Sequence, residues 1–189
     1  MAKLVVSQFV TTDGVFEDPG GAEDFDRGGW AFQFDRGPEG DRFKLDELMA
    51  SESLLLGRKT FEGFAAAWPS REGEFADKFN TMAKYVVSST LSDPEWNNST
   101  VIAPTEIAAR VGELRERPGG DILVNGSAQL VRALMDHDLV DEYRLMVFPV
   151  VLGAGRPVFP DGDSAQLQLA ETKPAGECVI LIYAPRRQQ

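Results

Sequence analysis

The chain has 189 residues, enough for one domain with a full core, and its hydrophobic share of 43% and charged share of 26% are typical of a soluble globular protein. Its 30 acidic residues against 19 basic ones give a formal net charge of −11, which excludes a broad cationic stripe for nucleic acid. The apolar runs are too short for a bilayer span, and the first residues carry no signal-peptide pattern. With a single cysteine, Cys178, which fits a reducing compartment, these features predict a cytoplasmic protein without membrane contact.

The first predicted element is a strand, and a long irregular segment follows it. The stretch KLVVSQFV (3–10) is apolar on both faces, as in a central strand. Residues 12–40 are dense in Gly, Asp and Pro, with aromatic residues between them. A connection of this length without a period is more often a functional lid than a tether. We therefore expect a long active-site loop at about 12–40.

Helices and strands alternate through the next part of the chain. Asp41 can cap a helix that carries Phe43, Leu45, Leu48 and Met49 on one side. The later elements, in order, are strand SLLLG (53–57), a short helix after Thr60, a helix marked by Phe75, Phe79 and Met82, strands KYVVSS (84–89) and STVIAP (99–104), a helix capped by Thr105 with Ile107, Val111 and Leu114 inside, strand DILVNGS (121–127) and a helix capped by Ser127.

Strands dominate the last third. EYRLMVFPVVLG (142–153) predicts a long strand in which Pro149 suggests an edge or a bulge. LQLAET (167–172) and ECVILIYAP (177–185) predict an antiparallel pair, with Cys178 as a small buried hydrophobe. This order predicts a three-layer α/β fold, with a mostly parallel sheet and an antiparallel C-terminal addition, in a single domain over residues 1–189.

Three predicted strand ends share one design, in which small or hydroxyl residues follow the strand. In LLLGRKT (54–60), Gly57 lets the backbone approach closely while Arg58 and Lys59 supply positive charge. YVVSST (85–90) supplies hydroxyl groups, and ILVNGSAQ (122–129) opens a helix whose dipole favours phosphate. Turns, caps and solvated cations explain each segment taken alone. The three together indicate a nucleotide pocket at the carboxyl edge of the sheet.

Other signatures are incomplete. GRKT lacks the phosphate-binding P-loop pattern, because Glu52 stands where its first glycine is needed. GAGRPV lacks the third glycine of the dinucleotide fingerprint, since Val158 fills that position. His137 is the only histidine and lies near a predicted helix end, so we expect a surface histidine and no metal site.

Several of these stretches, in this order, resemble the dihydrofolate-reductase-like fold over nearly the whole chain: VVSQFVTTDGV, LLLGRKTFEGF, YVVSST, ILVNGSAQ and the final strand pair. DLVDEYRLMVFPVVLGAGRPVF (138–159) is similar to the branch that includes the reductase domain of the bifunctional riboflavin-biosynthesis deaminase–reductase. The resemblance implies a mostly parallel sheet of about eight strands, helices on both faces, a C-terminal antiparallel hairpin, and NADPH across the carboxyl edge.

By this match, the resemblance implies a set of cofactor-binding residues. Phosphate groups would be held by Gly57, Arg58, Lys59 and Thr60, the region of the adenosine 2′-phosphate by Ser88, Ser89 and Thr90, and the pyrophosphate by Gly126, Ser127, Ala128 and Gln129. Arg58 is suited to bidentate phosphate binding, with Lys59 as a second point charge. The implied chemistry is hydride transfer from nicotinamide to a C=N or C=O carbon.

The substrate side is less defined. Asp13 in TTDGV matches an Asp of the riboflavin-type reductases, and an Asp-Gly turn explains it equally well. Trp30 and Phe32 are candidates for pocket walls or ordinary loop anchors. Asn125 stands where the riboflavin-type reductases usually have Glu. Asp41 falls where classical dihydrofolate reductases carry an acid, although a plain N-cap is the favoured explanation.

The sequence therefore predicts an NADPH-dependent reductase of a heterocyclic substrate, most like 5-amino-6-(5-phosphoribosylamino)uracil reduction in riboflavin biosynthesis. One alternative is reduction of dihydrofolate. Another, of a different class, is a non-catalytic NADPH-binding or sensor protein, which the Asn at position 125 and the lack of a convincing proton donor favour. The strand in VDEYRLMVFPVVLG (140–153) can pair two copies, as in the riboflavin-type reductases that the chain resembles, so we expect a homodimer.

Overall fold

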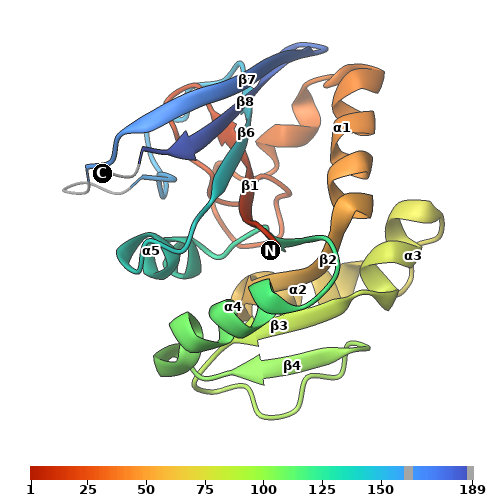
Figure 1. The fold of residues 1–189 in the computed structure, drawn as a ribbon. Helices are drawn as coiled ribbons and strands as arrows, with labels where there is room; N and C mark the ends of the chain where they lie inside the picture. The colour runs from red at the N-terminus through yellow and green to blue at the C-terminus, as the bar shows by residue number, and fades with distance from the viewer. Residues whose placement is uncertain (160–163, 187–189) are drawn as a thin grey trace. The chain divides into compact units, whose positions relative to one another are not determined.

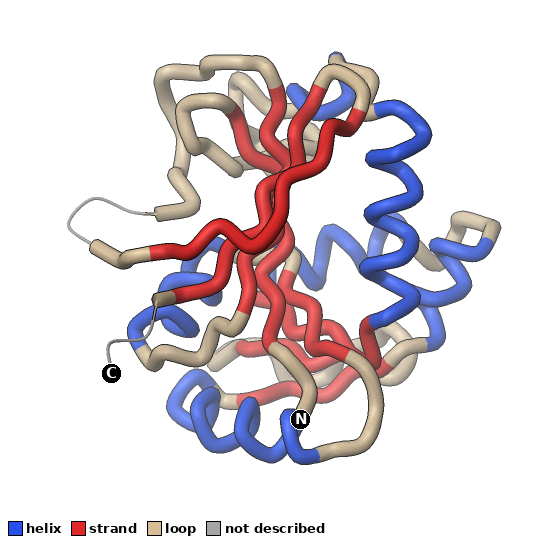
Figure 2. Tube along the Cα trace, turned by 45° about the horizontal axis from the view of Figure 1, so that its top comes forward, coloured by secondary structure: helices blue, strands red, loops and turns tan. Residues whose placement is uncertain are grey.

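The structure is a computed structural model that describes residues 1–159 and 164–186. Its eight strands follow the order β4-β3-β2-β5-β1-β6-β8-β7. The strands are labelled in Figure 1 and drawn in red in Figure 2. The chain divides into two compact units. Unit 1 comprises Met1–Val6 and Leu45–Val140, and unit 2 comprises Ser7–Lys44 and Asp141–Gln189. The predicted α/β fold is confirmed, and the single domain over 1–189 stays a prediction.

Unit 1 contains the parallel part of the sheet. Its strands are β2 (Ser51–Gly57), β3 (Ala83–Val87), β4 (Ser99–Ile102), β5 (Asp121–Val124) and the first residues of β1 (Leu4–Thr11). Among the described residues, β1 pairs with β5, β5 with β2, β2 with β3 and β3 with β4, and each of these pairs is parallel. Leu54, Leu55 and Leu56 are fully buried, as expected for a parallel strand covered on both faces.

The helices of unit 1 follow the predicted order with shifted starts. They are α2 (Arg58–Ala67), α3 (Glu74–Thr81), η2 (Pro104–Glu106), α4 (Ile107–Glu116) and α5 (Ala128–Asp136). α2 begins at Arg58 rather than after Thr60. Thr105 lies within η2 instead of capping α4, because Pro104 starts a 3₁₀ turn there. Ile107, Val111 and Leu114 are buried as predicted.

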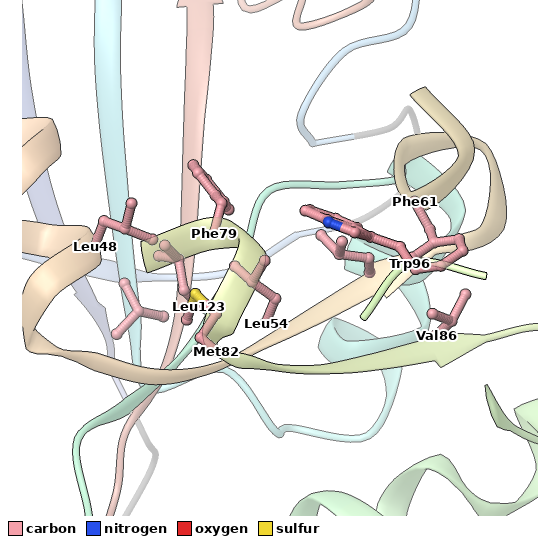
Figure 3. Packing of buried hydrophobic residues seen from close by; sticks show 10 residues of the cluster. Leu48, Leu54, Phe61, Phe79, Met82, Val86, Trp96 and Leu123 are labelled. Atoms are coloured by element: carbon pink, nitrogen blue, oxygen red, sulfur yellow. The ribbon is translucent and has the colours of Figure 1, made fainter. Parts of the chain in front are cut away.

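A hydrophobic cluster fills unit 1 between its helices and strands (Figure 3). Leu54, Val86 and Leu123 come from three neighbouring strands, and Phe79 packs its ring on Trp68 with ring centroids 4.6 Å apart. The other buried members are Val5, Leu48, Leu56, Phe61, Met82 and Trp96. Burial of this apolar surface stabilises the parallel strands whose ends carry the predicted cofactor segments.

Lys84 is a fully buried cation within unit 1. Its ammonium group donates to the carbonyl oxygens of Met82 at 2.8 Å, Asn97 at 2.9 Å and Asn80 at 3.3 Å, and lies 4.3 Å from the ring centroid of Trp96. Burial lowers the pKa of Lys84 to about 8. The three acceptors and the aromatic face replace the water that this ammonium group loses on folding.

Unit 2 contains the antiparallel strands β6 (Glu142–Phe148), β7 (Leu167–Ala175) and β8 (Cys178–Pro185). β8 pairs with both β6 and β7, so the predicted C-terminal antiparallel pair is confirmed. β6 ends at Phe148, and in the strand order it lies between β1 and β8. The edge or bulge predicted at Pro149 is therefore wrong, since the strand stops before a residue that cannot donate to a ladder.

The position of β6 also affects the predicted dimer. A strand with neighbours on both sides has its backbone hydrogen-bonding groups occupied, so β6 does not pair two copies through its backbone. The strands at the two ends of the order are β4 and β7. The homodimer itself stays a prediction.

The predicted loop at 12–40 is packed into unit 2. Val15 forms a β-bridge with Pro157, and the Asp18 carboxylate accepts a hydrogen bond from the Ala22 amide at 2.7 Å. A 3₁₀ helix, η1 (Trp30–Gln33), buries Trp30 edge-on to Phe148 with ring centroids 5.4 Å apart. These contacts anchor the segment along its length.

Helix α1 (Gly37–Ala50) begins inside the stretch predicted as loop. The Asp35 carboxylate accepts a hydrogen bond from the Gly37 amide at 2.8 Å, which turns the chain into the helix. Asp41 lies within the helix and pairs with Arg36 at 2.5 Å, so its prediction as the N-cap is wrong. None of the described helices is both long and apolar enough for a membrane span.

Candidate functional site

Three predicted segments end at the same edge of the parallel strands in unit 1. Leu54 of β2 pairs with Lys84 of β3 on one side and with Leu123 of β5 on the other. Three residues further along each chain segment stand Gly57, Val87 and Gly126. Because the strands are parallel, their carboxyl ends lie at one edge. The structure therefore brings LLLGRKT, YVVSST and ILVNGSAQ to the same edge, as the sequence predicts.

Gly57 and Gly126 lie in contact with the opposite segment. The Gly57 amide donates to the Gly126 carbonyl oxygen at 3.0 Å. A β-carbon at Gly57 would stand 2.2 Å from Ser127 Oγ, and one at Gly126, where φ is +130°, would stand 2.8 Å from Thr60 Oγ1. Side chains at these two positions would fill the space, so glycine is what allows the close approach.

Two helices begin at this edge. α2 starts with Arg58 directly after Gly57, and α5 starts with Ala128 and Gln129 directly after Ser127. Ser127 occupies the N-cap position as predicted, but among the described residues neither helix has a side-chain capping bond. The amide groups of both first turns and the positive ends of both dipoles therefore face this edge, an arrangement that favours anions.

The predicted cations lie on the first turn of α2. Arg58 is half-exposed, and its Nε lies 3.7 Å from Glu62 Oε1 one turn later. Lys59 is exposed. An exposed pair of this kind contributes little to stability. A phosphate group would therefore compete with Glu62 for the Arg58 guanidinium, and breaking the Glu62 pair would cost little free energy.

Ser88 forms the turn after β3. Its buried hydroxyl oxygen accepts hydrogen bonds from the amides of Thr90 at 3.1 Å and Leu91 at 3.0 Å. Ser89 and Thr90 are exposed beyond it. In this arrangement Ser88 shapes the loop, while Ser89 and Thr90 present their hydroxyl groups.

Asp13 joins two loops of unit 2. Its carboxylate accepts hydrogen bonds from Thr11 Oγ1 at 2.6 Å and from the amides of Gly153 at 2.8 Å and Leu152 at 3.3 Å. The Thr11 hydrogen bond, followed by those from the two amides, holds the pKa of Asp13 below its ordinary value. Asp13 is therefore ionised at neutral pH, which suits an acceptor rather than a proton donor.

The other substrate-side candidates differ in exposure. Trp30 is 1% exposed and donates its Nε1 hydrogen to the Glu17 carbonyl oxygen at 2.9 Å, so it anchors the core of unit 2. Phe32 is 79% exposed. Asn125 follows β5 and belongs to unit 1, whereas Asp13, Trp30, Phe32 and Asp41 belong to unit 2. Their gathering into one substrate pocket stays a prediction.

Sequence reasoning missed Lys44 of α1 and Lys84 of β3. The predicted apolar side of α1 is partly wrong, because Met49 is 44% exposed while Lys44 is partly buried and Glu47 is buried. The spacing of positions 37, 40, 44 and 47 is the helical period that could have revealed this inward side. It was missed because glycine, lysine and glutamate are not expected on a buried face.

A surface hollow of about 160 Å³ lies elsewhere in unit 1, between α4 and strands β3 and β4. Its arginines are engaged with protein groups, since Arg117 donates to Tyr85 Oη at 2.7 Å and Arg110 to Glu113 at 2.8 Å. None of the predicted cofactor residues lines it.

The structure also places the only histidine and the only cysteine of the sequence. His137 is exposed and stands at the C-cap of α5, as the sequence indicates. Cys178 is buried, and burial raises the pKa of its thiol. Within residues 1–159 and 164–186, no three His, Cys, Asp or Glu side chains gather as a metal site.

Comparison with known proteins identifies the family. The model of the RibD C-terminal domain matches residues 2–181. The chain belongs to the RibD C-terminal domain family. Two relatives from Bacillus subtilis (strain 168) are each 30% identical: uncharacterized protein YyaP over 186 residues, with 95% of this chain and 93% of the relative covered, and uncharacterized protein YwjB over 183 residues, with 96% and 97% covered.

Solved structures share the fold of this RibD C-terminal domain. A protein named "Putative riboflavin biosynthesis protein" from Shewanella sp. PV-4 matches with a TM-score of 0.77 and 17% identity, covering 99% of this chain and all of that one. Acinetobacter baumannii RibD matches with a TM-score of 0.68 and 15% identity, covering 98% of this chain and 58% of that one. The Thermotoga maritima diaminohydroxyphosphoribosylaminopyrimidine deaminase/5-amino-6-(5-phosphoribosylamino)uracil reductase matches with a TM-score of 0.63 and 12% identity, covering 98% and 57%. These matches confirm the predicted fold, and the family model confirms the predicted branch.

Proposed function

We propose that the chain is an NADPH-dependent reductase of a heterocyclic substrate, most like 5-amino-6-(5-phosphoribosylamino)uracil reduction. The observation that carries the proposal is the contact between Gly57 and Gly126, which sets two helix N-termini side by side at one sheet edge. The named reductase of Thermotoga maritima supports the reaction type. The family membership supports the same class.

The donor set fits a dinucleotide. Backbone amides at the starts of α2 and α5 would hold the pyrophosphate, together with Ser127 and the Thr60 hydroxyl. Arg58, Lys59, Ser89 and Thr90 would hold the adenosine 2′-phosphate and neighbouring phosphates, because charged and hydroxyl donors are exposed there. The nicotinamide, when bound, supplies a hydride, and the protein orients the rings and excludes water.

Calorimetric titration tests the cofactor assignment. We expect NADPH to bind more tightly than NADH, and the Arg58→Ala/Lys59→Ala variant to bind NADPH about 10- to 100-fold more weakly, because it loses charge-assisted hydrogen bonds. The Arg71→Ala/Lys78→Ala variant removes the same charge from the loop after α2 and from α3 in unit 1, and it should bind NADPH like the wild type. Equal NADPH affinity in the two double variants would reject the assignment.

The reaction is tested by following the loss of reduced nicotinamide absorbance. Oxidation of NADPH with 5-amino-6-(5-phosphoribosylamino)uracil supports the proposed reductase. Oxidation with dihydrofolate alone supports the first alternative. The Asn at position 125 favours a second alternative, a non-catalytic NADPH-binding or sensor protein, which predicts tight NADPH binding without turnover of either compound.

The assembly and location are proposed with the function. A homodimer is proposed, for which light scattering gives the mass in solution. The reducing compartment expected from a single cysteine supports a cytoplasmic location for an NADPH-dependent reaction.

A further inference from the structure

The hollow between α4, β3 and β4 in unit 1 has an apolar floor. Ile102 of β4 and Leu114 of α4 line it at 2% and 6% exposure, together with the partly buried Tyr85 of β3. The volume of the hollow is about 160 Å³. An engineered apolar cavity of about 150 Å³ in another protein holds one benzene molecule. The hollow therefore has room for a single six-membered ring.

Two guanidinium groups at the rim of the hollow have different partners. Arg110 is paired with the Glu113 carboxylate at 2.8 Å. Arg117 donates to Tyr85 Oη at 2.7 Å, and its Cζ lies 5.9 Å from the centroid of the Tyr85 ring. Within the described part of the chain, no carboxylate pairs with Arg117. A neutral phenol thus fixes the position of the Arg117 guanidinium without neutralising its charge.

Hydroxyl groups add further donors to the lining. Tyr85 accepts the hydrogen bond from Arg117, so the hydrogen of its own hydroxyl group is left to donate. The Thr100 hydroxyl group belongs to an exposed residue that also lines the hollow. Among the described lining residues Glu113 is the one carboxylate, and Arg110 holds it. Positive charge and hydrogen-bond donors are therefore in excess in this hollow.

We propose that the hollow binds a small aromatic carboxylate, with its ring on Ile102 and Leu114 and its carboxylate on Arg117. The planar guanidinium of an arginine matches the two oxygens of a carboxylate. The apolar floor favours a ligand with a ring over an inorganic anion, which has no apolar surface to bury. This site is separate from the proposed reductase site, because none of the predicted cofactor residues lines the hollow.

The experiment is a titration of the isotope-labelled full chain with benzoate, followed by the NMR shifts of its backbone amides. We expect shifts that saturate at Tyr85, Thr100 and Leu114, whether or not the protein binds NADPH. Benzyl alcohol carries the ring without the charge, and inorganic phosphate carries the charge without the ring. Each should bind at least about tenfold more weakly than benzoate, because each lacks one of the two contributions.

Arg117→Gln tests the cation assigned to the carboxylate. It should weaken benzoate binding about 3- to 10-fold, since solvent partly screens the exposed guanidinium. Arg71→Gln is the matched control. It removes another exposed guanidinium from an aromatic ring of unit 1, that of Trp68 at 4.6 Å, and Arg71 does not line the hollow. The control should bind benzoate within about twofold of the wild type.

Glu113→Gln should change the affinity in the opposite direction. It removes the carboxylate that repels an anion and occupies Arg110, so benzoate should bind about 2- to 5-fold more tightly. Partial unfolding cannot produce such a gain. If Arg117→Gln does not fold, Glu113→Gln and the two comparison ligands decide.

Four outcomes would overturn the inference: no benzoate binding to the wild type, equal binding of benzyl alcohol or phosphate, equal affinity in Arg117→Gln and Arg71→Gln, or weaker binding in Glu113→Gln. A protein that binds benzoate here but does not bind NADPH would reject the proposed function alone.

Discussion

Unit 1 and unit 2 are each stabilised internally by a different kind of contact. In unit 1, parallel strands are buried by apolar side chains at regular spacing, and Leu54, Val86 and Leu123 belong to one cluster. In unit 2, a long segment without regular spacing is fixed by single polar contacts, such as Asp13 with the Gly153 amide and Arg156 with Glu17. A segment whose apolar residues lack a regular spacing can therefore still be held in a fixed structure by polar contacts.

Both units also place one unusual side chain in their interior. Trp30 fills unit 2 from a 3₁₀ helix within the irregular segment. Lys84 brings a charge into unit 1 from the second residue of β3. Substitutions at these two positions test how far each unit depends on such an anchor.

The largest expected effect is from Trp30→Ala. Removing a buried indole that contacts Phe148 and donates to the Glu17 carbonyl should lower the free energy of unfolding by about 3 to 5 kcal/mol. Urea unfolding followed by circular dichroism measures it. Phe32→Ala in the same 3₁₀ helix is the control, because Phe32 is 79% exposed and its loss should change stability by less than about 0.5 kcal/mol. Similar losses in both variants would show that Trp30 is no special anchor.

Lys84→Met should cost about 2 to 4 kcal/mol of unfolding free energy. The aliphatic part is conserved, but the carbonyl oxygens of Met82, Asn97 and Asn80 lose a charged donor. Lys59→Met, at an exposed position, should stay within about 0.5 kcal/mol of the wild type.

Stability against pH gives Lys84 a second readout. With a folded pKa of about 8, below the ordinary value of 10.5, the unfolded chain binds more protons at Lys84 between these two pH values. This group therefore makes the folded state more stable as pH rises through that window. The stability difference between wild type and Lys84→Met should widen from neutral pH toward pH 10. A difference that stays constant would contradict the burial effect.

Gly57→Ala tests the close approach at the edge of unit 1. The new methyl group would stand 2.2 Å from Ser127 Oγ, so we expect a loss of about 1 to 3 kcal/mol in stability and weaker NADPH binding. Gly63→Ala is the matched control, because a β-carbon there meets nothing within 4 Å. In the interior of α2 it should stabilise the helix by about 0.5 to 1 kcal/mol. Unchanged NADPH affinity in Gly57→Ala would show that the close approach at Gly57 is not needed for cofactor binding.

Asp13→Asn should have the smallest effect, about 0.5 to 1 kcal/mol, because solvent screens this exposed carboxylate. Its pKa is lowered in the folded state, so its contribution is present at neutral pH and is lost as pH falls through the folded pKa. Wild type and Asp13→Asn should therefore converge in acid. A difference that persists in acid would point to a contact other than the charge.

The elements of unit 1 were easier to predict from the sequence than those of unit 2. Runs such as SLLLG and KYVVSS predicted β2 and β3 within a few residues, because short apolar runs that end in turn residues indicate strands. The predicted start of α1 was wrong. The carboxylate that binds the first amide of the helix belongs to Asp35, and the sequence pattern does not distinguish it from Asp41. The burial of Trp30 and the contact of Lys44 with Ser7 could not be predicted, since they depend on partners more than 30 residues away or on an irregular backbone.

The sequence by itself determined the order of the elements, the strand ends rich in Gly, Ser and Arg, and the family that these imply, because these features depend on local periodicity and on residue type. The tertiary structure alone decided that Gly57 meets Gly126, that Asp13 binds the Gly153 amide and that Lys44 reaches Ser7. Each of these contacts joins residues far apart in the chain, and the free energy that selects it comes from packing and hydrogen bonds that exist only once the strands are paired.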